Sequence, residues 1–335
     1  YDKTAMIITR TPYRISFFGG GTDYPEWFEN FGEGAVLSTT IDKYCYLACR
    51  HMPPFFENKS RVVWSKIELV DHPNEIEHPI VRESLKFLGM ENGVEIHHYG
   101  DLPARSGIGS SSSFAVGLLH ALNVLQKKSV SKKQLALDAI HIEQEKIGHD
   151  VGCQDQAAAA YGGFNRITFG GPEKINIRPV AISSETKKLL ESRLLMFFTG
   201  FSRDAFEITG EQVKATRQKE KELRKMLSLV DRAEKILLDS PKMLDDFGYL
   251  LHETWMLKRS LTGAISNAKI DDIYERARKA GALGGKLLGA GGGGFLLLYV
   301  KPEDQPKVKK ELGEFLDIPF SFEDEGTKLI YSDAS

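Results

Sequence analysis

The pattern of hydrophobic and polar residues predicts a sheet in the first third of the chain. Hydrophobic and polar residues alternate over residues 36–50 and 61–71, and residues 6–18 and 94–99 are predicted to be further strands. Residues 79–88 have the spacing of a short helix. This mixture of strands and helices is typical of the α+β class.

The second half of the chain is predicted to be mainly helical. Three segments with charged outer faces predict helices, namely residues 204–238, 241–262 and 270–280. Strands are predicted over residues 164–179 and 295–300. The chain therefore changes from a strand-rich part to a helix-rich part.

Length and composition describe a two-domain globular protein. A chain of 335 residues is longer than most single domains, and 41% hydrophobic residues are enough for a sizeable core. The change in pattern lies near residues 181–193, so we predict an N-terminal domain of residues 1–185 and a C-terminal domain of residues 186–335. The net charge of -2 gives no reason to expect nucleic acid or an acidic membrane as a partner.

Cysteine usage indicates a reducing compartment. Cys45, Cys49 and Cys153 are odd in number and lack metal-ligand spacing. Cys45 and Cys49 are expected to be core thiols on one strand face. The residues before Met6 lack a signal-peptide pattern, and Met6 is expected to be the native first residue. We therefore expect a cytoplasmic location.

Residues 102–125 carry the clearest chemical signal. A glycine- and serine-rich turn leads into an apolar helix that begins near Phe114. Gly107 and Gly109 let a ligand approach the backbone, and the serines of residues 110–113 supply hydroxyls and N–H groups at a helix N-terminus, which favours an anion. The turn is predicted to bind phosphate, unless the serines only cap the helix. The chain contains no Walker sequence, so a nucleotide site here belongs to another class.

A second glycine-rich loop follows the first predicted strand. Residues 19–21 are glycines and precede Thr22 and Asp23, so an open backbone lies beside a carboxylate. Polyol hydroxyls are natural partners of such a carboxylate, whereas a tight turn would explain the glycines alone. Arg14, on the strand before the loop, is either a surface residue or points into the site.

Two carboxylates in the middle of the chain suggest catalysis. The predicted helix of residues 131–148 places Glu143 on its apolar face. A carboxylate there either pairs with a buried arginine or binds a hard cation such as Mg²⁺. Asp155 opens a helix of small residues, where it is either an N-cap or, close to the phosphate loop, a proton acceptor. His141 and Glu145 are expected to form a solvated pair.

A third glycine-rich stretch, residues 284–294, precedes the strand predicted over residues 295–300. Gly289, Gly291 and Gly294 match G-x-G-x-x-G, but the dinucleotide motif follows a strand and opens a helix. Here the glycines are predicted to follow a helix and open a strand. They therefore indicate a close backbone approach, either between packed elements or to a ligand.

The three glycine-rich stretches, in this order, resemble the GHMP kinases, which include galactokinase, homoserine kinase, mevalonate kinase and phosphomevalonate kinase. The stretches are TPYRISFFGGGTDY, LPARSGIGSSSSF and KLLGAGGGGF, and the resemblance covers nearly the whole chain. It implies a two-domain α+β fold with a ribosomal-protein-like N-terminal domain and a ferredoxin-like C-terminal domain. It also implies ATP and Mg²⁺, with ATP over the second stretch.

The resemblance assigns roles to residues of this sequence. Asp155 matches the aspartate that takes the proton from the sugar hydroxyl, and Arg14 the basic residue that orients the acceptor. Ser111 and Glu143 match the Mg²⁺ ligands. The implied ATP contacts are Pro103, Ser106, Gly107, Ile108, Gly109, Ser110, Ser111 and Ser112. The expected substrate contacts are Gly20, Gly21, Thr22, Asp23, Gly291 and Gly292.

The first and third stretches, together with FTGFSRDAFEIT, are most similar to the branch that phosphorylates the anomeric hydroxyl of D-glycero-D-manno-heptose 7-phosphate. Gly20 and Gly21 stand where galactokinases have Glu-His, which argues against galactose. An acceptor with its own phosphate needs a second anion site. Arg203 is the first candidate for substrate binding there, with Lys258 and Arg259 behind it, unless each is a surface charge.

We therefore expect an ATP-dependent sugar kinase that forms heptose 1,7-bisphosphate for nucleotide-activated heptose. The alternatives are a kinase for an unphosphorylated sugar such as fucose or mannose, a non-enzymatic sugar and ATP sensor, and a dinucleotide-binding oxidoreductase. ATP and a small-molecule sugar phosphate are the expected partners, with neither nucleic acid nor a membrane. The sequence is silent on oligomeric state and leaves a homodimer open.

Overall fold

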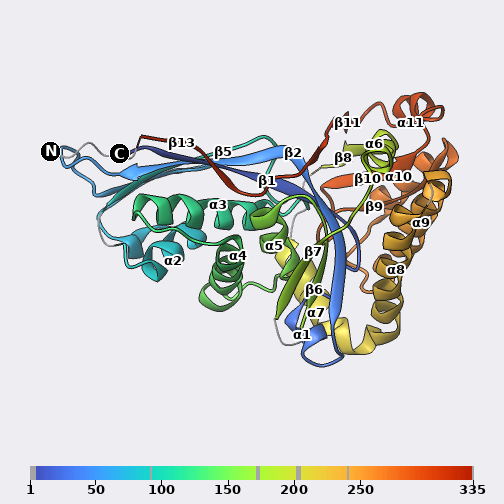
Figure 1. Cartoon of the computed structure of the whole chain (residues 1–335), viewed down its shortest axis with the longest axis horizontal. Helices are drawn as coiled ribbons and strands as arrows, with labels where there is room; N and C mark the ends of the chain where they lie inside the picture. Colours follow the sequence, from blue (N-terminus) through green and yellow to red (C-terminus); the bar gives the residue numbers. More distant parts are fainter. Residues whose placement is uncertain (1–4, 91–92, 171–173, 201–204, 240, 334–335) are drawn as a thin grey trace.

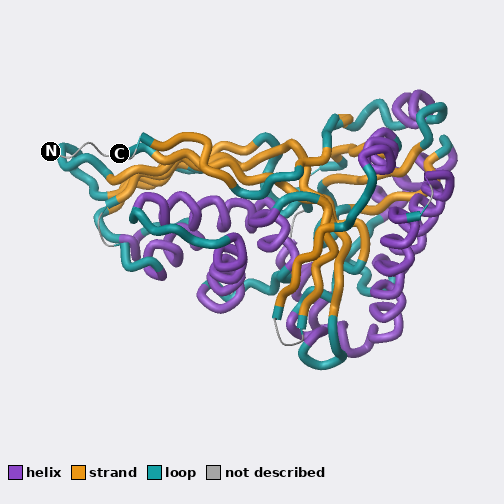
Figure 2. Tube along the Cα trace, viewed as in Figure 1, coloured by secondary structure: helices purple, strands orange, loops and turns teal. Residues whose placement is uncertain are grey.

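Two antiparallel-rich sheets and the helices packed on them form the protein (Figure 1). The computed structural model describes residues 5–90, 93–170, 174–200, 205–239 and 241–333. The larger sheet extends as a long arm toward the two termini, with helices on one of its faces (Figure 2). The smaller sheet lies at the opposite end, among the helices of the second half of the chain (Figure 1).

The larger sheet has nine strands, with the order β13-β1-β2-β5-β3-β4 and with β12, β6 and β7 off this path. Its strands are β1 (Ile7–Phe18), β2 (Gly34–His51), β3 (Ser60–Val63), β4 (Ile67–Val70), β5 (Val94–Gly100), β6 (Phe164–Phe169), β7 (Ile175–Pro179), β12 (Phe322–Glu323) and β13 (Lys328–Ser332). The strands predicted from the alternating pattern are thus confirmed. Residues 61–71 form a hairpin of two strands, β3 and β4.

The smaller sheet has the order β11-β8-β10-β9. Its strands are β8 (Leu194–Phe198), β9 (Ala282–Leu287), β10 (Phe295–Val300) and β11 (Leu316–Asp317). One expectation about the third glycine-rich stretch is wrong here. Its first residues form strand β9, so the glycines join two antiparallel strands and do not follow a helix directly.

The helices pack on both sheets. They are α1 (Pro25–Phe28), α2 (Pro79–Phe87), α3 (Ser110–Leu125), α4 (Lys132–Ile140), α5 (Gln154–Tyr161), α6 (Ser184–Ser192), α7 (Ala205–Ala215), α8 (Glu220–Leu238), α9 (Leu244–Arg259), α10 (Ala268–Lys279) and α11 (Gln305–Glu311), with short 3-10 helices η1 (Pro73–Glu75), η3 (Thr216–Lys219) and η4 (Pro241–Met243). Where β2 pairs with β6, the larger sheet has α5 on one face and α8 on the other. The apolar α3 is buried on β1, where Thr9 Oγ1 donates to the carbonyl of Gly117 at 3.0 Å. A Cβ on Gly117 would lie 2.6 Å from Thr11 Oγ1, so glycine permits this close contact.

The helix predicted over residues 131–148 is interrupted. It begins at α4, where Ser131 caps it by accepting from the N–H of Gln134, and continues as a π-helix, η2 (His141–Lys146). The wider turn inserts one residue into the helical repeat and is a frequent feature of functional sites. His141 and Glu145 form the predicted pair at 2.9 Å.

The last strands of the chain return to the larger sheet. β12 pairs with β2, and β13 pairs with β1, so the C-terminal segment completes the sheet that the N-terminal segment begins. Helix α8 also packs into the core of this sheet, through residues such as Leu229 and Val230. The division into domains at residue 185 stays a prediction, because β12 and β13, near the end of the chain, belong to the larger sheet.

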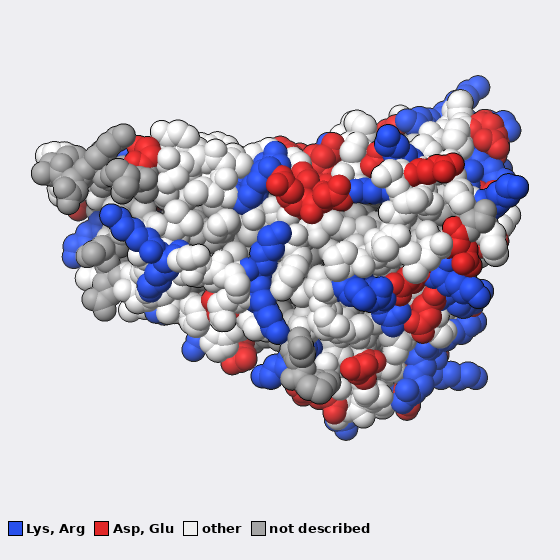
Figure 3. Space-filling view, viewed as in Figure 1, with Lys and Arg blue, Asp and Glu red and all other residues white. Residues whose placement is uncertain are grey.

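Within the described ranges, no helix is both long enough and apolar enough to cross a membrane. Figure 3 shows one face of the molecule, on which positive and negative side chains lie close together over the C-terminal helices. Lys225 and Arg232, for example, both pair with Glu253. The three cysteines are buried as free thiols, which confirms the expectation for Cys45 and Cys49.

Candidate active site

A cavity of about 830 Å³ lies between the three glycine-rich stretches. One part of its wall is aromatic and is called here the aromatic half, with Tyr13, Trp64, His78, His98 and Phe114. Another part is polar and is called the polar half, with Ser16, Asp23, Gln154, Gln212, Lys258 and Lys286. The glycine-serine turn and the Arg14–Asp155 pair also line the cavity, with Gly107, Gly109, Ser110, Ser111, Arg14 and Asp155. The cavity thus offers separate surfaces to an aromatic base and to a polyol.

The turn that is predicted to bind phosphate, called here the phosphate loop (residues 106–112), is held in place by the third glycine-rich stretch. A Cβ on Gly107, where φ is +85°, would lie 2.3 Å from the carbonyl oxygen of Leu288. The N–H of Phe295 donates to the carbonyl of Ser106 at 3.1 Å. Glycines of the third stretch therefore take part in packing between elements, and Gly289 also lines the cavity.

The serines of the loop do not cap α3. The helix begins after Gly109, which has the left-handed φ of +72°, and within the described chain no side chain caps its N-terminus. Ser113 Oγ donates to the carbonyl of Pro12 at 2.9 Å, while Ser111 and Ser112 point to Glu143. The alternative in which the serines only cap the helix is wrong, and the positive end of the helix dipole faces the cavity.

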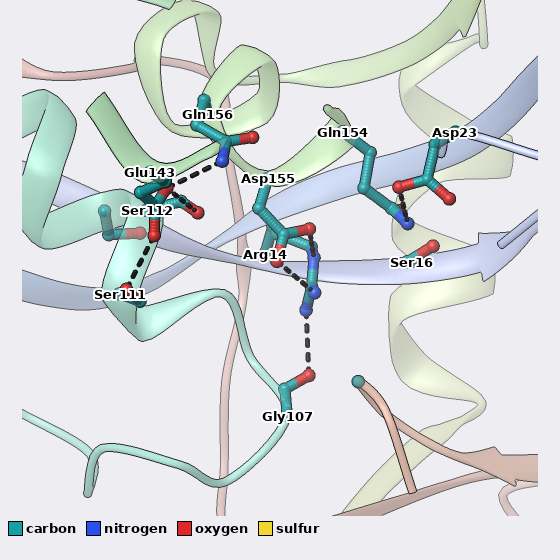
Figure 4. A network of polar contacts seen from close by, with 12 residues as sticks. Arg14, Ser16, Asp23, Gly107, Ser111, Ser112, Glu143, Gln154, Asp155 and Gln156 are labelled. Atoms are coloured by element: carbon teal, nitrogen blue, oxygen red, sulfur yellow. Dashed lines mark hydrogen bonds and ion pairs between the residues drawn. The ribbon is translucent and has the colours of Figure 1, made fainter. Parts of the chain in front are cut away.

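Glu143 is a buried carboxylate held by three donors (Figure 4). Ser111 Oγ and Ser112 Oγ donate to its two oxygens at 2.6 and 2.7 Å, and Gln156 Nε2 donates at 2.6 Å. Burial raises the pKa of Glu143, and these hydrogen bonds oppose the shift. No arginine pairs with it in the described part of the chain, so the structural ion pair that the sequence left open is not formed.

Arg14 and Asp155 form a two-bonded ion pair at the centre of the cavity. Arg14 Nε and Nη2 each donate to an Asp155 oxygen at 2.7 Å, and Nη1 donates to the carbonyl of Gly107 at 2.8 Å. Asp155 lies in the first turn of α5, whose N-cap is Cys153, so the N-cap alternative for Asp155 is wrong. Arg14 is only 5% exposed and is not a surface residue. A Cβ on Gly109 would lie 3.3 Å from Asp155 Oδ2, which shows how close the pair is to the phosphate loop.

Asp23 lies in the polar half and accepts from the N–H of Gly21 at 2.9 Å and from Gln154 Nε2 at 2.8 Å. It is 1% exposed, and burial raises its pKa, with Asp155 adding to the shift. Ser16 Oγ also faces this half, and within the described residues it has no hydrogen-bond partner. Such groups can accept and donate hydrogen bonds to a polyol.

The structure brings most of the sequence-predicted site residues together, and some of them act as scaffold. Gly20, Gly21 and Asp23 line the cavity, whereas Thr22 holds its own loop by donating to Gly19 O at 2.8 Å. Ser106 donates to the carbonyl of Pro103 at 2.5 Å, and Ile108 is buried beneath the loop.

Two of the expected substrate contacts, Gly291 and Gly292, pack on the backbone of Ile265 and are not among the described lining residues. Arg203 lies outside the described residues. Of the two further candidates, Lys258 lines the cavity, whereas Arg259 pairs with Asp271 at 2.7 Å.

The aromatic half is the part of the site that the sequence did not reveal. His78 stacks on Phe114 with ring centroids 4.6 Å apart and contacts Trp64 edge to face at 4.9 Å. Burial lowers the pKa of His78 to about 4, so the ring is neutral at physiological pH. These residues come from distant segments without a shared motif, and only the fold brings them together.

Comparison with known proteins identifies the family. Residues 78–163 match the model of the GHMP kinases N-terminal domain, and residues 233–318 match that of the GHMP kinases C-terminal domain. The D-glycero-alpha-D-manno-heptose 7-phosphate kinase of Campylobacter jejuni is 31% identical over 96% of this chain and 98% of its own length. The chain belongs to the GHMP kinase family. The expected two-domain α+β fold of this family and its kinase activity are thereby confirmed.

Two further relatives extend the comparison. The bifunctional fucokinase/GDP-fucose pyrophosphorylase of Arabidopsis thaliana is 26% identical over 90% of this GHMP kinase and 30% of its own length. A crystal structure of a D-glycero-D-manno-heptose 1-phosphate kinase from Bacteriodes thetaiotaomicron superposes with a TM-score of 0.78 at 22% identity, covering 97% of this chain and 99% of that one. At this identity the structural likeness establishes the fold alone.

Proposed function

We propose that this GHMP-family sugar kinase transfers the γ-phosphoryl group of ATP to the anomeric hydroxyl of D-glycero-D-manno-heptose 7-phosphate. The product is the 1,7-bisphosphate, which would supply nucleotide-activated heptose. The single observation that carries the proposal is the Arg14–Asp155 pair between the phosphate loop and a polar half suited to a polyol. The 31% identity to a heptose 7-phosphate kinase over nearly the whole length supports this acceptor.

In the proposed reaction, the phosphates of ATP lie on the loop of residues 106–112 and at the N-terminus of α3, with the base against the aromatic half. Asp155 accepts the proton of the anomeric hydroxyl while the oxygen forms a bond to the γ-phosphorus. The bond between this phosphorus and the bridging oxygen breaks, and ADP leaves with that oxygen. Positioning and charge neutralisation supply most of the rate in such transfers.

Arg14 has two functions in this proposal. Two hydrogen bonds from Arg14 to Asp155 fix the carboxylate, and a third fixes the carbonyl of Gly107 in the loop. Arg14 therefore holds the acceptor site and the ATP site in a fixed position relative to each other. A guanidinium has five N–H donors, and the three bonds leave two for the transferred phosphoryl group. The guanidinium of Arg14 stabilises negative charge that develops in the transition state.

GHMP kinases use ATP, generally with Mg²⁺, and the residues around Glu143 fit this cation. Ser111 donates its proton to Glu143, so the lone pairs of its oxygen remain for a hard cation. Within the described ranges, no group of three or more His, Cys, Asp or Glu side chains could hold a metal ion alone. Mg²⁺ commonly uses one or two protein oxygens together with substrate phosphates and water. When bound, it would neutralise charge on the phosphates.

Measuring ADP release with Mg·ATP and a panel of acceptors tests the proposal. Heptose 7-phosphate should be turned over, and free heptose, fucose and mannose should be poor acceptors. Preference for free fucose or mannose would favour the second candidate, a kinase for unphosphorylated sugars, which the similarity to the fucokinase supports. The absence of turnover with every acceptor would refute both candidates.

A further inference from the structure

Two lysines in the polar half of the cavity have no part in the reaction described above. Lys258, near the end of α9, is 6% exposed, and Lys286, on β9, is 3% exposed. Lysine is almost never buried unless a charged partner compensates it. In the described part of the chain, however, neither amine forms an ion pair with a carboxylate. Their burial at the wall of a ligand cavity therefore calls for a partner that the protein itself does not provide.

The two amines differ in what they already bind. Lys286 Nζ donates to the carbonyls of Ser16 and Phe17 at 2.7 and 3.0 Å, and so ties β9 to the end of β1. Lys258 Nζ donates to the carbonyl of Gly289. An ammonium group has three donors, so a single bond leaves most of the capacity of Lys258 for a ligand.

The balance of charge in the polar half also indicates an anionic ligand. Asp155 is matched by Arg14 in the two-bonded pair, which leaves Asp23 to face both lysines. Burial lowers the pKa of Lys258 to about 8, with Arg14 adding to the shift, and Asp23 and Asp155 oppose it. Burial, Lys258 and Arg14 lower the pKa of Lys286 well below its ordinary value. An anion in this half would restore the charged form of these amines.

We propose that Lys258, with Lys286 behind it, binds a phosphoryl oxygen in the polar half of the cavity, separately from the phosphate loop. The inference rests on the proposed function and adds a specificity or charge-stabilising residue to it. The phosphoryl oxygen belongs either to the acceptor's own phosphate or to the group in transfer, and an ammonium point charge suits both. Arg259, the other described basic candidate from the sequence, forms an ion pair with Asp271 and does not line the cavity.

Kinetics of Lys258→Met with Mg·ATP and two acceptors, heptose 7-phosphate and free heptose, tests this assignment. If the acceptor's phosphate is the ligand, KM for heptose 7-phosphate rises about 10-fold or more, while kcat/KM for free heptose stays within about twofold. If the group in transfer is the ligand, kcat falls about 10-fold or more with both acceptors. Unchanged kcat and KM with both acceptors would overturn the assignment.

Controls separate this inference from a structural effect and from the proposed function. Arg259→Met removes the same charge one residue along α9, outside the cavity, and should leave kcat and KM unchanged. Wild-type kcat/KM should fall above about pH 8 as Lys258 of the free enzyme loses its proton, and Lys258→Arg should keep its kcat/KM there; a decline that persists in Lys258→Arg contradicts the role. If the wild type prefers free heptose, the heptose 7-phosphate acceptor is wrong, whereas a kcat loss in Lys258→Met still supports Lys258.

Discussion

Replacing Gly107 by alanine tests whether the phosphate loop depends on its contact with the third glycine-rich stretch. The new Cβ would lie 2.3 Å from the carbonyl oxygen of Leu288 and 2.7 Å from its carbonyl carbon, whereas ordinary contacts begin at 3.4 Å. The loop or the strand end must therefore move by roughly 1 Å, and a shift of about 1 Å at an active site can cost about 10²-fold in rate. We expect kcat/KM for ATP to fall by about that factor.

The substitution also affects folding, because φ at Gly107 is +85°. A side chain in this left-handed region costs about 1–2 kcal/mol. Gly89→Ala is the matched control: φ there is +65°, and no atom lies within 4 Å of the added Cβ. Both variants should lose stability through the backbone, measured as Tm, but only Gly107→Ala should lose activity. Equal activity of the two variants would refute the argument that this contact positions the loop.

Three further variants test individual groups. Asp155→Asn should lower kcat by about 10²- to 10⁴-fold with little change in KM for ATP, and near-normal turnover would exclude Asp155 as the base. Glu143→Gln should raise the Mg²⁺ concentration for half-maximal activity about 10-fold or more; an unchanged requirement would exclude a metal role. Burial raises the pKa of Glu143 in the folded protein, so the free energy of unfolding should decrease as pH rises from 4.5 and Glu143 ionises. Glu143→Gln should lack this decrease when the free energy of unfolding is measured by chemical denaturation. Burial lowers the pKa of His78 to about 4, so the free energy of unfolding should fall by about 2 kcal/mol as pH decreases from 6.5 toward 4. His78→Gln should reduce this dependence on pH. An equally steep decrease in the variant would contradict the burial of His78 as a neutral ring.

The sequence predicted those features of the fold that depend on local pattern. Alternation located the strands, and helical spacing placed Glu143 on a buried face even though a π-helix interrupts the helix there. Gly107 and Gly109 marked the turn before α3, because glycine readily adopts the positive φ found at both positions. Each of these features is determined by residues that are neighbours in the sequence.

The remaining features depend on contacts between distant segments. The stack of His78 on Phe114 joins residues from α2 and α3 through the tertiary fold, and no local pattern indicates it. The contact of Gly107 with Leu288 and the return of β13 to β1 likewise join residues far apart in the chain. Lys258 was one of three basic candidates for a second anion site in the sequence, and the fold shows that it is buried beside the cavity.

The central claim concerns the atom that receives the phosphoryl group, and phosphorus-31 and proton NMR of the product test it most directly. After incubation of the wild-type enzyme with Mg·ATP and heptose 7-phosphate, we predict a second sugar phosphorus signal that couples to the anomeric proton. A new phosphorus coupled to any other carbon-bound proton, or ADP formation without a new sugar phosphate, would contradict the account.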